Sequence, residues 1–209
     1  MPDEAVLDTL KFAIGQPVLR TEDPRLLTGG GRFTADVNLP GQAHARFVRA
    51  RIAHGEIRAI HTAAAAAMPG VLGIYTGADL AADGIGTIPS ALPLKNRDGS
   101  PYIVPPHPAL ATGRVRHVGE ACALVVAESA ALAEDAVEAV AVELDPLPVV
   151  TEAEGAAEAG APQLWDEAPG NVCLDYFVGD EGLAEAAFAD AAHVSKITID
   201  NTRMVVNAM

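Results

Sequence analysis

The clearest pattern of apolar and polar positions lies between residues 121 and 145. Ala121–Ala127 is a continuous apolar run, which is typical of a buried strand. Ser129 follows where it can cap a helix. The next apolar residues recur at helical spacing and the acidic residues between them face water (Ala133, Ala136, Val137 and Val140; Glu134, Asp135 and Glu138). Residues 140–145 then alternate as a strand does, so this window predicts a strand–helix–strand crossover unit within a mixed sheet.

Shorter elements are expected before this unit. Residues 42–49 alternate apolar and polar positions, which predicts a half-exposed strand. Turn residues and apolar runs predict a strand or hairpin approach at 26–37, strands at 57–60 and 71–75, and a brief helix at 63–67, capped by Thr62 and ended by Pro69-Gly70. Residues 77–110 contain Gly or Pro at many positions, so we expect a long structured loop there.

The composition changes after residue 150. Residues 151–169 are rich in Ala, Glu, Gly and Pro, which favours a surface linker and a domain boundary. Asp180 is expected to cap a helix that runs to about Ala191, and His193–Asp200 alternates as a strand. These few elements cannot bury a core of their own. We therefore predict an N-terminal lead at 1–20, an α+β domain at 21–150, a linker at 151–179 and the start of a further domain, cut short, at 180–209.

Charge excludes one class of function. The chain has 28 acidic and 14 basic residues, a formal net charge of −14, which would repel the phosphate backbone of a nucleic acid. Residues 1–10 lack the basic and apolar regions of a signal peptide, and no apolar run approaches the roughly 20 residues of a membrane span. We expect a soluble, cytoplasmic protein.

Candidate chemistry is sparse. Two cysteines, Cys122 and Cys173, cannot by themselves hold an iron–sulfur cluster or a four-ligand zinc site, and two free thiols are favoured over a disulfide. Gly29-Gly30-Gly31 is interpreted as a turn rather than a phosphate-binding loop, because no Lys-Ser/Thr pair follows it. The six histidines lack metal-ligand spacing and are interpreted as surface or hydrogen-bonded residues (His44, His54, His61, His107, His117 and His193).

Glu120 is the most interesting polar residue. It follows Gly119 and precedes an apolar strand, so its carboxylate would be buried and would need a partner such as Arg116 or His117. Structural pairing is favoured over general acid–base catalysis, which also requires a pocket. We assign no catalytic, cofactor-binding or metal-binding residue in this chain.

An ordered series of short motifs resembles the N-terminal part of the molybdenum-binding large subunit of the xanthine dehydrogenase, aldehyde oxidase and carbon monoxide dehydrogenase family. The resemblance covers nearly the whole chain from about Ile14. The matching pieces are Arg20-Thr21-Glu22-Asp23-Pro24-Arg25-Leu26-Leu27-Thr28-Gly29, Gly31-Arg32-Phe33 with Asp36, Pro40-Gly41, Phe47-Val48-Arg49 with Ala53-His54, Pro69-Gly70-Val71, Tyr75-Thr76-Gly77-Ala78-Asp79-Leu80, Val115-Arg116-His117-Val118-Gly119-Glu120 and Leu147-Pro148-Val149-Val150. Arg51-Ile52 and His107-Pro108 depart from the usual pattern, which leaves the substrate subtype open.

The resemblance implies a fold and a function. Residues 21–150 would form the family's α/β hammerhead domain, and 180–209 would begin a molybdopterin-binding domain. The family hydroxylates aldehydes or heterocycles with a water-derived oxygen at a molybdenum–molybdopterin centre, for which a bacterial relative is expected to use the cytosine dinucleotide form. Electrons leave through [2Fe-2S] clusters to FAD, which are expected in partner subunits. The remaining molybdopterin-binding domains, in the same or a separate chain, are further expected partners.

The sequence predicts that the active site is not complete within these residues. Asn201–Met209 resembles the approach to a Met-Glu-Pro-Arg motif, and the family's catalytic residues are expected beyond it. The alternative is a non-catalytic hammerhead scaffold or interaction module; a separate small catalytic domain is disfavoured because no nucleophile, base and pocket can be nominated together.

Overall fold

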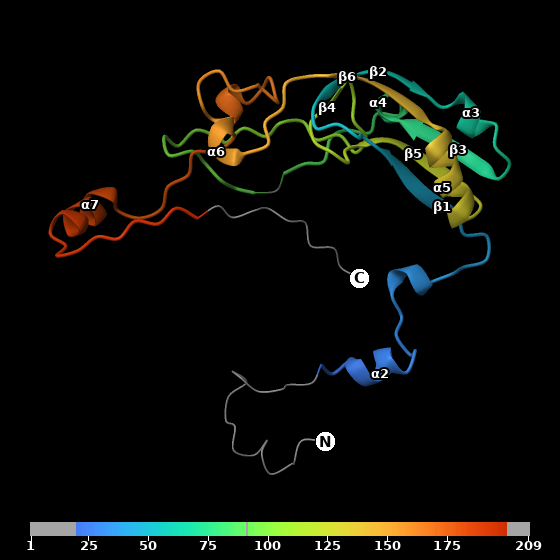
Figure 1. Ribbon diagram of the computed structural model, residues 1–209, viewed down its shortest axis with the longest axis horizontal. Coiled ribbons are helices and arrows are strands. Elements are labelled where there is room, and N and C mark those ends of the chain that lie inside the picture. The colour runs from blue at the N-terminus through green and yellow to red at the C-terminus, as the bar shows by residue number, and fades with distance from the viewer. Residues whose placement is uncertain (1–19, 91, 200–209) are drawn as a thin grey trace, which may run out of the picture. The chain divides into compact units, whose positions relative to one another are not determined.

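The computed structural model describes residues 20–90 and 92–199, and its contacts divide the chain into two compact units (Figure 1). One unit comprises residues 1–40 and 199–209, and the other is Gly41–Thr198. None of the helices in the described ranges is long and apolar enough to cross a membrane.

The first unit contains a short helix where the sequence predicted a strand or hairpin approach. Helix α2 spans Asp23–Leu27, and a 3-10 helix, η1, spans Thr34–Asp36. Pro24 suits the first turn of a helix, and the Thr28 hydroxyl donates a hydrogen bond to the Pro24 carbonyl at 2.8 Å. Gly29 then adopts a positive φ of 75°, which ends the helix. The strand prediction at 26–37 was therefore wrong, because local capping decides the structure here.

The second unit contains every strand of the described residues. Its elements are β1 (His44–Arg49), β2 (Gly55–His61), α3 (Ala63–Ala66), β3 (Val71–Thr76), α4 (Gly77–Ala82), β4 (Arg114–Val115), β5 (Ala121–Ala127), α5 (Ala130–Ala139), β6 (Ala141–Pro146), α6 (Ala153–Ala156), the 3-10 helix η2 (Pro169–Asn171) and α7 (Glu181–Ala189). The predicted strands at 42–49, 57–60, 71–75, 121–127 and 140–145 are thus confirmed. So is the loop at 77–110, apart from α4 at its start.

The strands form two three-stranded sheets, in the orders β1-β5-β3 and β4-β2-β6. The α+β class is confirmed, but the expected mixed sheet is not found, because every strand pair in the described part of the chain is antiparallel. The predicted crossover unit also fails: β5 and β6 lie in different sheets. Since β1 and β3 occupy both edges of β5, the chain leaves α5 to pair β6 with β2 instead.

Helix α5 covers one face of the β1-β5-β3 sheet (Figure 1). Its Ala136 packs in a buried cluster with Val48 of β1 and Ala123 and Val125 of β5. Ser129 caps the helix as predicted, accepting a hydrogen bond from the Leu132 N–H at 3.2 Å. A second cluster contains Ala50, Ala111, Val115 and Cys122 and joins the end of this sheet to the other sheet.

The segment expected to be a linker forms an ordered loop. The Asn171 side chain donates to the carbonyls of Ala156 at 2.8 Å and Pro162 at 2.9 Å, and accepts from the Leu164 N–H at 2.9 Å. Asn171 has a positive φ of 58°, a conformation that Asn tolerates better than most residues. The division into segments at 20, 150 and 179 stays a prediction.

Helix α7 begins as expected and the strand after it does not form. Asp180 caps it by accepting from the Leu183 N–H at 2.9 Å, and none of its residues is buried. Residues 193–199 are not in a strand, so this part of the prediction was wrong. The rest of the predicted strand, and the segment 201–209 noted above, lie outside the described residues.

Candidate functional site

Glu120 stabilises a turn, as the favoured interpretation of the sequence held. Its carboxylate accepts a hydrogen bond from the Arg116 backbone N–H at 2.5 Å and lies 3.7 Å from His117 Nδ1. The side chain is only 11% exposed. Gly119, at a positive φ of 85°, closes the turn. A carboxylate committed to a backbone N–H in this way is an anchor for the chain.

The same turn is fixed to the end of β1. The backbone N–H of Gly119 donates to the Ala50 carbonyl at 2.8 Å, and the Ala50 N–H donates to the Glu120 carbonyl at 2.8 Å. The Arg49 guanidinium adds a bond to the Gly119 carbonyl at 2.8 Å. The motif at 115–120 therefore serves to hold β1 and β5 together at one end.

Arg116 stacks on Trp165, a contact that the sequence analysis missed. Its guanidinium carbon lies 3.6 Å from the centre of the indole ring, and its Nε donates to the Leu164 carbonyl at 2.9 Å. Burial lowers the pKa of Arg116, although the nearby Glu120 carboxylate acts in the opposite direction. Trp165 is the only tryptophan of the chain, and this was the one feature of the sequence that could have drawn attention to it. This contact connects the loop at 156–171 to the turn at 115–120, which precedes β5.

One of the six histidines is buried. His54 is 4% exposed, and its Nδ1 bonds to the Pro148 carbonyl at 2.7 Å. Its Nε2 is buried without a hydrogen-bond partner, so the expectation of a fully satisfied histidine is wrong for this atom. His61 is exposed and bonds to Glu143 at 2.9 Å.

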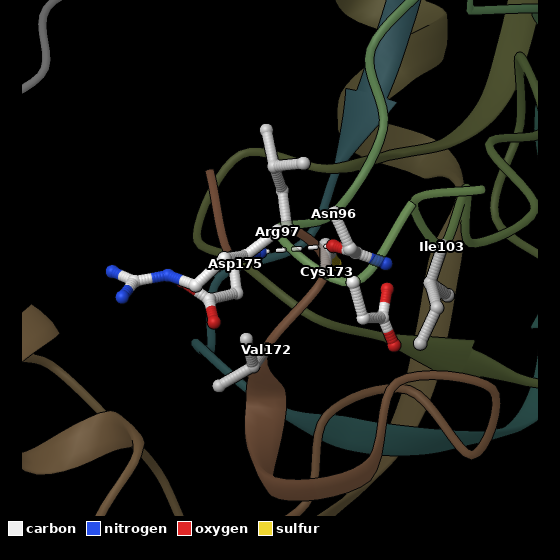
Figure 2. Close-up of a pocket in the computed structure, with 8 residues that line it drawn as sticks. Asn96, Arg97, Ile103, Val172, Cys173 and Asp175 are labelled. Atoms are coloured by element: carbon white, nitrogen blue, oxygen red, sulfur yellow. Dashed lines mark hydrogen bonds and ion pairs between the residues drawn. The ribbon is translucent and has the colours of Figure 1, made fainter. Parts of the chain in front are cut away.

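A shallow hollow of about 460 Å³ lies where residues 96–103 meet residues 172–175 (Figure 2). The Asp175 N–H donates to the Asn96 side-chain oxygen at 2.9 Å, and the Ile103 N–H donates to the Cys173 carbonyl at 2.9 Å. Arg97 lies 4.6 Å from the centre of the Phe177 ring and 3.4 Å from a Glu181 carboxylate oxygen. The sequence placed these residues in two separate loops, and spacing alone could not bring them together.

The hollow lacks the parts of a catalytic site. Cys173 is a free, half-buried thiol at its wall, but no hydrogen bond from a base reaches its sulfur in the described structure. Arg97 is already engaged by its acidic and aromatic neighbours. Cys122, also free, is fully buried, and burial raises the pKa of its thiol, which makes it unreactive.

The described residues do not fit a metal or an iron–sulfur cluster. No group of three or more His, Cys, Asp or Glu side chains within residues 20–90 and 92–199 could hold a metal ion. The turn at Gly29-Gly30-Gly31 ends α2, as the Gly30 N–H donates to the Arg25 carbonyl at 2.8 Å. Several polar side chains of the described residues bond to backbone groups of the chain, among them Glu120, Asn171 and Asp180.

Comparison with known proteins identifies the class. A sequence model described as "Aldehyde oxidase and xanthine dehydrogenase, a/b hammerhead domain" matches residues 28–148. The chain belongs to this family, whose members include large subunits of molybdenum oxidoreductases.

Individual relatives agree with this assignment. The chain is 41% identical to the nicotine 6-hydroxylase large subunit of Paenarthrobacter nicotinovorans over 181 residues, which cover 87% of this chain and 21% of that protein. It is 35% identical over 182 residues to the carbon monoxide dehydrogenase large chain of Hydrogenophaga pseudoflava, covering 81% of this chain and 21% of that one.

Solved structures share the fold. Reconstituted CO dehydrogenase from Oligotropha carboxidovorans matches with a TM-score of 0.67 at 31% identity, over 86% of this chain and 22% of that chain. Quinoline 2-oxidoreductase from Pseudomonas putida 86 matches with a TM-score of 0.61 at 41% identity, over 70% of this chain and 18% of that chain. The chain thus spans about a fifth of the length of these relatives.

Proposed function

We propose that this chain supplies the hammerhead portion of the large subunit of a molybdenum hydroxylase. The observation that carries the proposal is the 41% identity to the nicotine 6-hydroxylase large subunit over 87% of the chain. The complete enzyme would convert a C–H group to C–OH with oxygen from water, releasing two electrons and two protons per turnover. The role of this portion is assembly, a proposal supported by the polar turn at 115–120, whose hydrogen bonds hold β1 and β5 together.

A nitrogen heterocycle is the substrate class that we favour. Two of the more similar relatives are named for nicotine and for quinoline, and both are 41% identical to this chain over the matched part. Relatives named for carbon monoxide are less similar, at 35% and 31%. An aldehyde is the other substrate class that the family implies.

The cofactors belong to other parts of the proposed enzyme. Molybdenum would be held as a molybdopterin complex, in the cytosine dinucleotide form, by the remaining domains of the large subunit. The [2Fe-2S] clusters and FAD would lie in partner subunits. Among the described residues, no group of three or more His, Cys, Asp or Glu side chains could hold a metal ion. Location in the cytoplasm stays a prediction that cell fractionation would test.

The first experiment is to purify the protein from its native host with whatever polypeptides accompany it, and to measure their masses and the molybdenum content. Molybdenum together with a polypeptide that contains the remaining large-subunit domains is the expected result. The same preparation should oxidise nicotine or quinoline with a dye as electron acceptor, and oxygen-18-labelled water should label the product. Cells grown with tungstate provide the control, since tungsten replaces molybdenum while the polypeptides stay the same.

A metal-free, well-folded monomer would contradict the proposal. In that case the chain would be a hammerhead scaffold without the chemistry.

A further inference from the structure

The segment that leads into α7 lies along the turn at 95–101 and is held there by a small set of polar contacts. We call residues 172–181 the strap. The turn itself is closed by the bridge between Lys95 and Pro101. Three hydrogen bonds join the strap to residues 96–103 (Figure 2): the Arg97 N–H donates to the Asp175 carbonyl at 2.7 Å, the Ile103 N–H to the Cys173 carbonyl at 2.9 Å, and the Asp175 N–H to the Asn96 side-chain oxygen at 2.9 Å.

The Arg97 side chain adds the only charged contacts printed between the turn and the strap in the described part of the chain. Its guanidinium carbon lies 4.6 Å from the centre of the Phe177 ring, and its Nη1 lies 3.4 Å from a Glu181 carboxylate oxygen. Its Nε lies 3.9 Å from an Asp175 carboxylate oxygen. One cation thus meets three side chains of the strap, and the last of them, Glu181, is in the first turn of α7.

Burial contributes little to holding this part of the chain in place. Every residue from Asp175 to Thr198 is exposed, including Leu183 and Phe188 of α7 at 71% and 64%. Both buried clusters of the described residues lie instead between Val48 and Val140. Because burial of apolar side chains is the main source of stability, the order of this segment depends on its contacts with residues 96–103. A segment held in this way can detach while the sheets stay folded.

We propose that the strap is a reversible, salt-sensitive conformational device and that Arg97 controls it. In the closed state Arg97 holds the start of α7 beside the turn at 95–101. In the open state Arg97 releases Phe177 and Glu181, and residues 172–190 leave the hollow. The side chains of Arg97 and Glu181 are 49% and 59% exposed, so dissolved ions screen their attraction. The device belongs to this chain alone and requires none of the cofactors of the proposed enzyme.

Amide hydrogen exchange of the 209-residue chain is the first test. In Arg97→Ala, the N–H groups of Asp175 and Ile103 should exchange about tenfold faster, because a cation–π contact and two surface ion pairs are lost together. The amides of the central strand β5 should exchange at an unchanged rate. Unchanged exchange at Asp175 and Ile103 would overturn the proposal. An equal acceleration in β5 would overturn it too, because the whole chain would then open as one.

The matched control removes an ion pair of similar exposure elsewhere on the surface. The Arg46 side chain is 50% exposed and its Nε lies 3.1 Å from a Glu134 carboxylate oxygen of α5. Arg46→Ala should therefore leave the exchange of Asp175 and Ile103 unchanged. If R46A accelerated these two amides as much as R97A does, the effect would come from net charge and the role of Arg97 would be refuted.

Salt distinguishes an electrostatic role of Arg97 from local packing. Raising the ionic strength from about 0.01 M to about 1 M shortens the Debye length from about 30 Å to about 3 Å. The strap amides of the unmodified chain should then exchange about threefold faster, whereas those of R97A should not respond. Arg97→Lys keeps the charge but loses the planar stacking on Phe177, so its strap should open more readily and remain salt-sensitive. Equal salt responses of the unmodified chain and R97A would overturn the proposal.

The two free cysteines give an independent measurement of the open state. Cys173 is half-buried at the wall of the hollow, where the strap meets the turn, and Cys122 is fully buried between the sheets. In R97A, iodoacetamide should label Cys173 about threefold faster and Cys122 at an unchanged rate, since only unfolding of the sheets exposes Cys122. An unchanged rate at Cys173 would refute opening of the strap, and an equal acceleration at Cys122 would show unfolding of the whole chain in its place.

Discussion

At the residue scale, Glu120 gives the sharpest test of a structural role. Replacing it by alanine leaves the partly buried Arg116 N–H without its acceptor, which should cost about 1 kcal/mol in the free energy of unfolding. Glutamine keeps an acceptor of the same shape and should lose less. Urea denaturation of both variants measures the difference.

The control for Glu120 is Glu138→Ala on the exposed side of α5, which should change stability by no more than about 0.5 kcal/mol. If E120A were as stable as the unmodified protein, the carboxylate would not be the anchor of the turn, and a catalytic role would have to be reconsidered.

Asp79 carries a prediction about pH. The Thr76 hydroxyl and backbone N–H both donate to one oxygen of its carboxylate at 2.7 Å, and these bonds lower the pKa of Asp79. The pKa of Asp79 is therefore lower in the folded state than in the unfolded state. Its contribution to stability is fully present above the unfolded-state pKa and is lost as the pH falls through the folded-state pKa. Carbon NMR titration should find its midpoint below that of an ordinary aspartate, and Thr76→Val should raise it. A midpoint unchanged by T76V would contradict the assignment.

At the element scale, two capping residues of the same kind should have different effects. Ser129 caps α5, whose Ala133 and Ala136 are buried, so Ser129→Ala should lower the free energy of unfolding by about 0.5–2 kcal/mol. Asp180 caps α7, none of whose residues is buried, so Asp180→Ala should fray that helix and leave global unfolding almost unchanged. Denaturant titration and amide exchange at 181–189 distinguish the two. Equal global losses would show that α7 is part of the cooperative core.

The elements also show which parts of the fold a sequence can reveal. The strand–helix–strand run from Ala121 could be predicted because its signals are local: an apolar run, a serine cap and helical spacing. The pairing of those strands could not, because it depends on β1 and β3 reaching β5 first. The order of the loop at 156–171 could not be predicted either, because three of its hydrogen bonds come from a single side chain, Asn171, amid Ala and Gly.

At the scale of the whole molecule, the family could be inferred from the sequence and most of the site geometry could not. The ordered motifs pointed to the hammerhead family, which the match at 28–148 confirms. By contrast, the contacts that matter most join residues far apart in the chain, as Arg116 with Trp165 and Asn96 with Asp175. The pairing of Phe47 and Tyr75 with Leu124 of β5 likewise becomes visible only once the strand register is known.

The division of the molecule into two units leads to the last prediction. All residues of both buried clusters lie between Val48 and Val140, and none of the residues 20–40 whose burial is described is buried. A chain that begins at Gly41 should therefore fold, and its free energy of unfolding should differ from that of the full chain by no more than about 0.5 kcal/mol.

The matched control ends the chain before β6, after Val140, which leaves Ile57 and Ile60 of β2 without their paired strand and should prevent cooperative unfolding. A loss of more than about 2 kcal/mol on removing residues 1–40 would instead show that the first unit completes the core of the second, and that the hammerhead domain folds only as a whole.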